Sequence, residues 1–175
     1  MPLPYLHLGT GLFFGTTLAK RINLAAFLIG AVFPDIEPGI LVIYNWQYPP
    51  SSYPHHWLMH SFLAGFLFAI LAAILLTNYG KKLEEVEKQI IHKSLFFRQK
   101  SFKVIFLSGL LGYWLHVFLD GVMHYDVSPF WPLKTNQLLR IISFSNENLI
   151  LAIIGIIGLF LFIFQLIRKD SNKSI

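Results

Sequence analysis

Residues 104–123 read Val-Ile-Phe-Leu-Ser-Gly-Leu-Leu-Gly-Tyr-Trp-Leu-His-Val-Phe-Leu-Asp-Gly-Val-Met, an apolar stretch in which His116 and Asp120 stand out. About 20 predominantly apolar residues are enough for an α-helix to cross a bilayer. An Asp at the centre of such a helix costs roughly 2.5–3.5 kcal/mol, so ionisable groups there usually serve a function. The stretch therefore predicts a membrane helix that carries a functional polar pair.

Two further stretches have the same apolar character, Trp57–Tyr79 and Asn148–Ile167. Two shorter ones precede them, Tyr5–Ala19 and Ile22–Phe33, and both are too short to cross a bilayer comfortably. They predict a short N-terminal helical hairpin that dips into the membrane or spans a locally thinned bilayer. The expected fold is an all-α, polytopic membrane bundle of about five helices, made of three full spans plus this hairpin.

The composition agrees with a membrane protein, because 55% of the 175 residues are hydrophobic and only 13% are charged. Soluble domains carry about a quarter charged residues. The length predicts a single domain over residues 1–175. The chain has no cysteine, which excludes disulfides, thiolate ligands, iron–sulfur clusters and a cysteine nucleophile. The N-terminus lacks the basic segment of a signal peptide.

Basic residues predict the orientation of the spans. Lys20 and Arg21 separate the two short stretches, the loop at 80–103 holds seven Lys or Arg against three Glu, and the tail at 168–175 is also basic. The positive-inside rule places these regions in the cytoplasm. The opposite ends of the spans then share the non-cytoplasmic face, where many Trp and Tyr residues indicate the headgroup level. Lys134 and Arg140 are exceptions to this charge pattern.

Histidines and aspartates cluster at those opposite ends. Residues four apart lie on one face of a helix, so His116, Asp120 and His124 form one row, and His56 with His60 has the same spacing. His and carboxylate side chains are common ligands of zinc. The candidate metal ligands are His7, Asp35, His55, His56, His60, His116, Asp120 and His124, and the candidate catalytic residues among them are Asp35, His60 and Asp120.

Each candidate also has an ordinary structural explanation. A single intramembrane histidine often just bonds a neighbouring helix. Asp35 after Pro34 is also typical of a turn or a cap, and one of His55 and His56 is expected at the rim of the site. Remaining residues are expected in supporting roles: Ser61 beside His60, Glu37 and Asp126 as carboxylates that orient imidazoles, His92 in solvent, and Gly11 and Gly15 in close helix packing.

Five motifs in order resemble those of membrane-bound metal-dependent hydrolases, some of which are described as LexA-binding inner-membrane proteins. The motifs are His7-Leu8-Gly9, Phe33-Pro34-Asp35-Ile36-Glu37, His55-His56-Trp57-Leu58-Met59-His60-Ser61, His116-Val117-Phe118-Leu119-Asp120 and Trp131-Pro132-Leu133. The third departs from the family, because His56-Trp57 replaces Arg-Gly. The His-x-x-x-Asp element is also distantly similar to one in zinc-dependent phospholipase C, which implies a phosphoester substrate.

The expected function is that of a membrane-embedded hydrolase that uses zinc, as two or three ions, with Mn²⁺ and Fe²⁺ as alternatives. Its expected partners are membrane lipid and a lipid or phosphoester substrate; no nucleic acid is expected, and the oligomeric state is left open. One alternative is a haem-binding or metal-transport protein, although two aspartates argue against haem. Another is a non-catalytic scaffold that binds a regulator through the basic loop.

Overall fold

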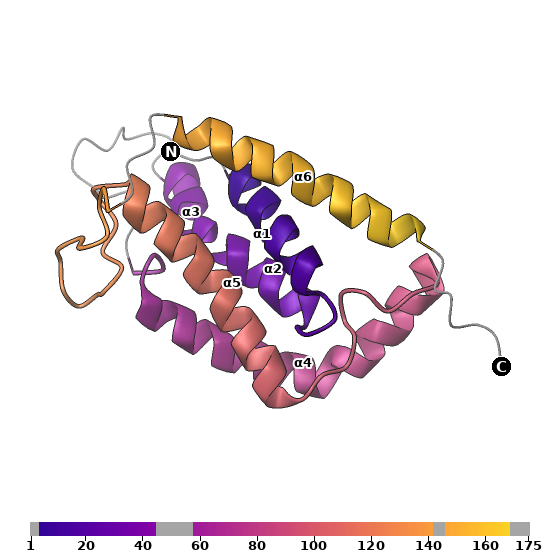
Figure 1. The fold of residues 1–175 in the computed structure, drawn as a ribbon. Helices are drawn as coiled ribbons and strands as arrows, with labels where there is room; N and C mark the ends of the chain where they lie inside the picture. The colour runs from indigo at the N-terminus through magenta and orange to yellow at the C-terminus, as the bar shows by residue number, and fades with distance from the viewer. Residues whose placement is uncertain (1–3, 45–57, 142–145, 169–175) are drawn as a thin grey trace.

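The computed structural model describes residues 4–44, 58–141 and 146–168, and every regular element in these ranges is a helix (Figure 1). The elements are α1 (Pro4–Leu18), α2 (Leu24–Val32), the 3₁₀ helix η1 (Phe33–Asp35), α3 (Ile36–Tyr44), α4 (Phe62–Ile91), α5 (Phe102–Met123) and α6 (Glu147–Ile167). Three of these helices, α4, α5 and α6, are long and apolar enough to cross a membrane. The predicted all-α bundle of three spans and a short N-terminal hairpin is confirmed.

The short helix α2 lies at the centre of the bundle. Its apolar residues point in every direction, and a helix that is hydrophobic all round is expected to be buried. Leu24, Ala26 and Phe27 are at most 2% exposed. A Cβ at Gly112 of α5 would collide with the backbone of Phe27, so only glycine allows α5 to approach α2 this closely. The N-terminal hairpin is therefore part of the core.

Helix α1 packs between α2 and α6 (Figure 1). A Cβ at Gly9 would lie 2.7 Å from the Cα of Gly155 in α6, so this pair of glycines brings the two backbones together. Gly11 and Gly15 face α2, where added Cβ atoms would meet Ala31 and Leu24. The predicted packing role of Gly11 and Gly15 is confirmed.

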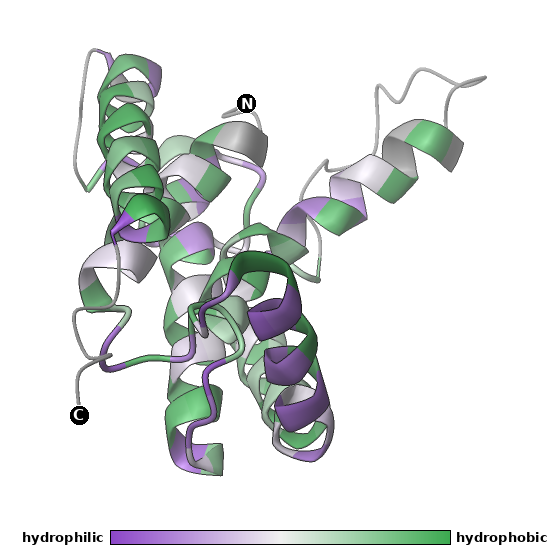
Figure 2. Ribbon diagram, turned by 90° about the vertical axis from the view of Figure 1, so that its right-hand side faces the viewer, coloured by the Kyte–Doolittle hydropathy of each residue, from purple (hydrophilic) through white to green (hydrophobic). Residues whose placement is uncertain are grey.

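The outer surfaces of α4 and α6 are apolar. Leu67, Ile156 and Phe160 are among the large hydrophobic side chains that are more than half exposed. Figure 2 shows hydrophobic residues along α6, whereas hydrophilic residues appear on the last part of α4. Exposed apolar surfaces of this kind are compatible with contact to the acyl chains of a bilayer, so the outer sides of α4 and α6 are expected to face lipid.

The predicted boundaries of α4 were wrong at both ends. Residues 58–61 form a turn, and the helix begins after Ser61, whose hydroxyl oxygen accepts a hydrogen bond from Ala64 N at 3.1 Å. The helix then continues through the Lys- and Glu-rich segment, because these residues favour helix, and it ends at His92 in the left-handed conformation. The predicted loop at 80–103 thus shrinks to residues 92–101.

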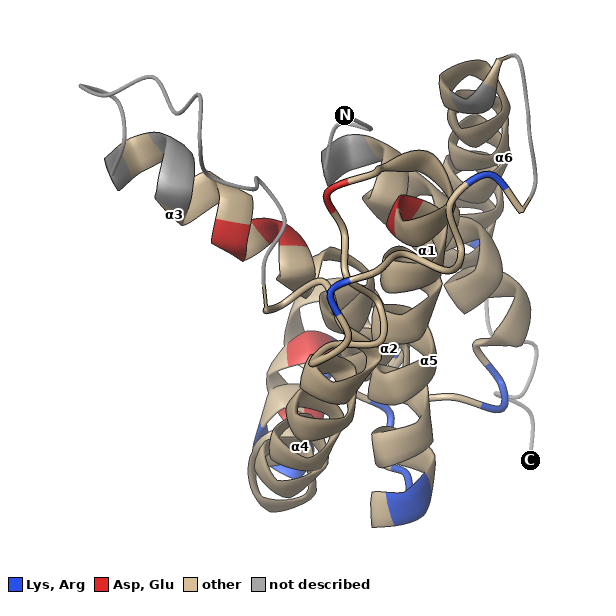
Figure 3. Ribbon diagram, turned by 90° about the vertical axis from the view of Figure 1, so that its left-hand side faces the viewer, with Lys and Arg blue, Asp and Glu red and all other residues tan. Residues whose placement is uncertain are grey.

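The basic regions meet at one end of the bundle. Lys93 Nζ donates hydrogen bonds to the carbonyls of Gln165 and Leu166 at the end of α6, at 3.0 and 2.8 Å. Lys100 Nζ donates to the carbonyl of Lys20 in the α1–α2 turn, at 2.9 Å. Figure 3 shows Lys and Arg at this end and on the loop that follows α5. The structure thus groups the segments as the charge pattern predicted.

Candidate metal centre

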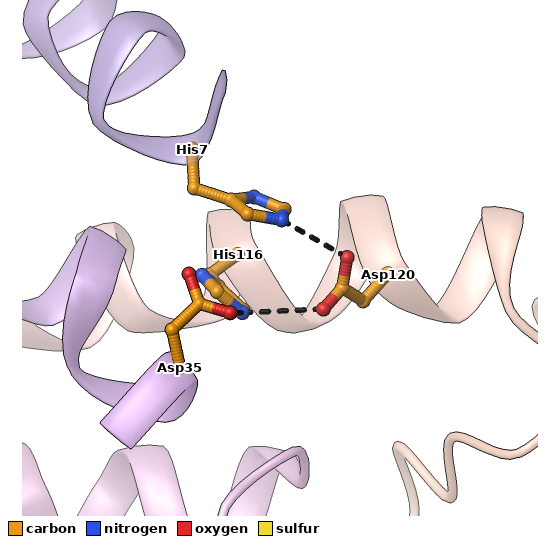
Figure 4. A group of neighbouring side chains, drawn as sticks. All are labelled: His7, Asp35, His116 and Asp120. Atoms are coloured by element: carbon orange, nitrogen blue, oxygen red, sulfur yellow. Dashed lines mark ion pairs between the residues drawn. The ribbon is translucent and has the colours of Figure 1, made fainter. Parts of the chain in front are cut away.

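Three helical segments and one turn bring their polar side chains together at the other end of the bundle. His7 comes from α1, Asp35 from η1, and His116 and Asp120 from α5; each offers one ligand atom, and these atoms all lie within 4.8 Å of one another (Figure 4). His60, in the turn before α4, lies beside them, with Nε2 3.3 Å from His116 Nε2. We call these five residues the His/Asp cluster.

Asp120 lies at the centre of the cluster and is 1% exposed. Its Oδ1 lies 3.1 Å from His7 Nε2. Its Oδ2 lies 3.2 Å from His116 Nε2 and 3.4 Å from His60 Nε2. One carboxylate therefore contacts three imidazoles from three segments that are remote in sequence. The one-turn spacing of His116 and Asp120 places both on the inner face of α5, as predicted.

The second nitrogen of two of these histidines is already engaged. His116 Nδ1 lies 2.8 Å from the carbonyl oxygen of Ala31, and His60 Nδ1 lies 3.3 Å from Glu37 Oε2. Both partners are acceptors, so each Nδ1 carries the hydrogen. In neutral imidazoles the lone pairs are then on the two Nε2 atoms, which face each other next to Asp120 Oδ2. This arrangement of acceptors requires a cation or a proton between them.

Glu37 at the start of α3 holds the turn that carries His60. Its carboxylate accepts a hydrogen bond from Met59 N, at 3.2 Å to Oε2, in addition to the contact with His60 Nδ1. Burial lowers the pKa of His60, but hydrogen bonds and charge interactions with Asp120 and Glu37 outweigh burial and raise the pKa to about 9. The two carboxylates thus favour positive charge at His60. Glu37 takes the orienting role expected of a carboxylate behind a metal-binding imidazole.

His7 and Asp35 complete the cluster from the side of α1 and η1. The His7 ring stacks on that of His116, with the centroids 3.9 Å apart. Asp35 Oδ1 lies 3.8 Å from His116 Nε2. Within the described part of the chain, Asp35 Oδ2 and His7 Nδ1 are buried without a hydrogen-bond partner. Buried polar atoms normally have partners, so these two atoms point to a ligand.

The remaining predicted ligands stand apart from this group. His124 is the C-cap of α5, and its Nε2 lies 3.9 Å from Asp120 Oδ1, which places it at the rim. His55 and His56 lie outside the described residues. His60 itself lies in a turn of residues 58–61 rather than on a helix, contrary to the prediction. Ser61 caps α4, which agrees with its predicted supporting role.

Two supporting residues were missed by the sequence reasoning. Tyr113 donates a hydrogen bond to the carbonyl of Met59 at 2.6 Å and so fixes the turn next to His60. It precedes His116 by three residues and shares its helix face, a signal that was present in the sequence. Asn136 donates to the carbonyls of Gly121 and His124, both at 2.7 Å, and closes the end of α5. No sequence pattern indicated this second contact.

The cluster lies below the end of α5. Asp120 is three residues from the last residue of the helix and His116 is seven. At a rise of 1.5 Å per residue, these positions lie about 5 and 10 Å along the axis from that end. Trp114 and Trp131 are 38% exposed and Tyr125 is 85% exposed. These three of the aromatic side chains predicted to mark the membrane interface are thus exposed, whereas the cluster itself is buried.

Comparison with protein families assigns the chain to one of them. The family model of the YdjM inner membrane proteins matches residues 1–173. The chain belongs to this family. The match supports a membrane location and carries no indication of hydrolase or phospholipase C similarity. No curated protein and no solved structure matches the chain.

Proposed function

We propose that the protein is a membrane-embedded, zinc-dependent hydrolase that cleaves a phosphoester in a lipid or a lipid-linked substrate. The observation that carries the proposal is the convergence of His60 Nε2, His116 Nε2 and Asp120 Oδ2, which lie 3.2–3.4 Å apart. Three electron-pair donors at this spacing repel one another unless they share a cation or a proton. Coordination of zinc at 2.0–2.2 Å would require only small shifts of these side chains.

The donor set fits zinc better than haem. His60 and His116 present Nε2 while Nδ1 bonds a carboxylate or a carbonyl, which is the arrangement that orients metal-binding imidazoles. Carboxylate oxygens from Asp35 and Asp120 suit zinc, manganese or iron(II). Haem iron instead takes His, Met, Cys or Tyr. The residues present therefore support a hydrolytic ion, and His7 Nε2 with Asp120 Oδ1, 3.1 Å apart, offers donor atoms for a second.

Zinc, when bound, acts as a Lewis acid and lowers the pKa of water to about 7. Side chains of the protein supply the groups that accept and donate protons. Asp35 Oδ2, buried and without a hydrogen-bond partner in the described residues, is placed to accept a proton from the attacking water. His124 at the rim is placed to donate a proton to the leaving oxygen. Burial of the cluster excludes bulk water, which strengthens each of these interactions.

The substrate is proposed from the position of the cluster. It lies within the end of a span, close to exposed aromatic residues and opposite to the basic end of the bundle. The positive-inside rule then places the cluster on the non-cytoplasmic side. A lipid headgroup is the phosphoester that this position brings nearest. Lys134 or Arg140, in the exposed segment after α5, would supply the positive charge for a phosphate.

The test uses purified protein in detergent, with its metal content measured in the same preparation. Wild type, Asp35→Asn and Glu87→Gln are compared on phosphatidic acid, phosphatidylglycerol and polyprenyl phosphates. We expect release of phosphate or alcohol by wild type and Glu87→Gln, and a loss of more than about 100-fold in Asp35→Asn, the size of a missing general base. Zinc-loaded wild type that leaves every substrate intact would contradict the proposal. A visible absorption band from bound haem would instead support the haem-binding alternative.

A further inference from the structure

Helix α3 stands apart from the rest of the bundle. It follows η1 directly and packs mainly against it. Figures 2 and 3 show α3 projecting outward at the end where α5 finishes. Its first turn is tied to the His/Asp cluster through the Glu37 carboxylate, whose Oε2 lies 3.3 Å from His60 Nδ1. The helix is thus fixed at its base, and Gly39, Ile40 and Ile43 further along it are exposed among the described residues.

One face of α3 is a row of isoleucines. Ile36, Ile40 and Ile43 are 45%, 58% and 78% exposed, and their spacing of four and three residues places them on one side of the helix. Gly39 lies on the same side, and a Cβ there would meet nothing within 4 Å. We call this side the isoleucine face. Exposed apolar rows of this kind are unfavourable in water and indicate a partner.

The position of α3 indicates which partner. With nine residues it is too short to span a membrane, yet its only charged residue, Glu37, is committed to the cluster. It leaves the bundle at the level where α4 begins, and the first turns of α4 expose Leu63, Phe66 and Leu67. The isoleucine face thus extends the lipid-facing surface of the spans. A helix of this length with an exposed apolar side at this level can bury that side among acyl chains at the membrane interface.

We propose that α3 is an interfacial helix whose isoleucine face rests among the acyl chains of the leaflet next to the His/Asp cluster. Asp35 of the cluster immediately precedes Ile36, so a lipid that contacts the first turn of α3 has its headgroup beside the metal ligands. Lipids therefore reach the cluster sideways from the leaflet. This path for a substrate rests on the proposed function, whereas the lipid contact of α3 does not.

The chain contains no cysteine, so a single nitroxide label can be placed anywhere without background. Ile40→Cys and Ile43→Cys are labelled in vesicles of phosphatidylcholine and phosphatidylglycerol. Collisions of the label with oxygen, which partitions into lipid, and with a water-soluble nickel chelate are measured by electron paramagnetic resonance. Leu149→Cys and Phe160→Cys serve as lipid references on α6, and Gln137→Cys serves as the aqueous reference at the same end.

We expect both α3 labels to collide with oxygen several-fold more than with the nickel chelate. For each α3 label, the ratio of oxygen collisions to nickel collisions should lie nearer to the ratio measured at Leu149, at the beginning of α6, than to that at Phe160, further into the span. A ratio like that of Gln137 would show that α3 lies in water and would overturn the proposal. Exclusion of both reagents would show a protein cover and would overturn it as well. Neither outcome depends on metal binding or hydrolysis.

Discussion

The two ends of the bundle satisfy their buried polar groups in opposite ways. At the basic end, the Glu87 carboxylate accepts hydrogen bonds from the backbone N–H groups of Leu95, Phe96 and Phe97 at 2.7–3.0 Å. At the other end, imidazole nitrogens and carboxylate oxygens face one another. The first arrangement is complete within the chain, whereas the second calls for a cation or a proton. A buried carboxylate is thus a structural cap at one end and a candidate ligand at the other.

The largest effect is expected on substitution of Asp120, at the centre of the His/Asp cluster. Asp120→Asn keeps the size of the side chain but removes the charge that three imidazoles contact. We expect zinc affinity to fall by more than about 100-fold, because loss of an orienting partner alone typically costs 10–100-fold. Elemental analysis after gel filtration, supported by chelator competition, measures the change. Equal zinc in wild type and Asp120→Asn would remove Asp120 from the metal site.

Glu87→Ala is the matched control at the basic end. It leaves three backbone N–H groups without their acceptor, so thermal stability should fall by the equivalent of about 2–4 kcal/mol while zinc content stays unchanged. Asp120→Asn should show the reverse pattern, with zinc lost and with a smaller change in the thermal stability of the metal-free protein. If Glu87→Ala also lost zinc, the two ends would be coupled and the comparison would fail.

The next largest effect is the dependence of zinc affinity on pH. The pKa of His60 is raised to about 9, so a proton occupies His60 Nε2 below that pH and must leave before a metal binds. Zinc affinity should therefore rise about tenfold per pH unit between pH 7 and 9 and then level off, or about 100-fold over this range. Competition with a chelator of known pH dependence measures it. A flat profile would show that His60 stays outside the coordination sphere.

A smaller effect is expected at Glu37, which touches His60 from the side away from the ion. Glu37→Gln keeps an acceptor for Met59 N but removes a charge that raises the pKa of His60. Zinc affinity at pH 9 should fall about 10–100-fold, as for other orienting partners. The pH at which binding levels off should also move downward, which a purely structural role would not produce. Glu37→Ala should add a loss of stability through the free Met59 N–H.

The sequence predicted the membrane spans because hydrophobic length is a local property. The end of α5 at Met123 was correct, and the grouping of the basic segments followed from charge alone. The beginning of α4 was missed, because the spacing of His56 and His60 suggested a helix before Ser61, whereas Ser61 caps a helix that begins at Phe62. The α4–α5 connection was predicted too long. Lys and Glu favour helix, so α4 continues through the Lys- and Glu-rich segment beyond its apolar part.

The cluster was only partly predictable. The pair His116 and Asp120 follows from helical periodicity, but the approach of His7 and Asp35 depends on the burial of α2, which positions η1 and α1 against α5. That burial depends on glycines such as Gly112, whose role appears only in three dimensions. Glu37 and Tyr113 act through the backbone of Met59, a contact between residues remote in sequence. Side-chain type therefore indicated the chemistry, and packing decided which residues meet.

The smallest effect is expected at His124, which marks the border between the cluster and the exposed segment after α5. Its Nε2 lies 3.9 Å from Asp120 Oδ1, farther than the three imidazoles that contact Asp120 at 3.1–3.4 Å. His124→Ala should reduce zinc affinity by less than about tenfold, below the usual cost of an orienting partner. His116→Ala, measured beside it by the same chelator competition, should show the full loss of a ligand. If the two variants lost zinc equally, His124 would belong among the metal ligands, and the cluster would extend from the buried interior of the bundle to its surface.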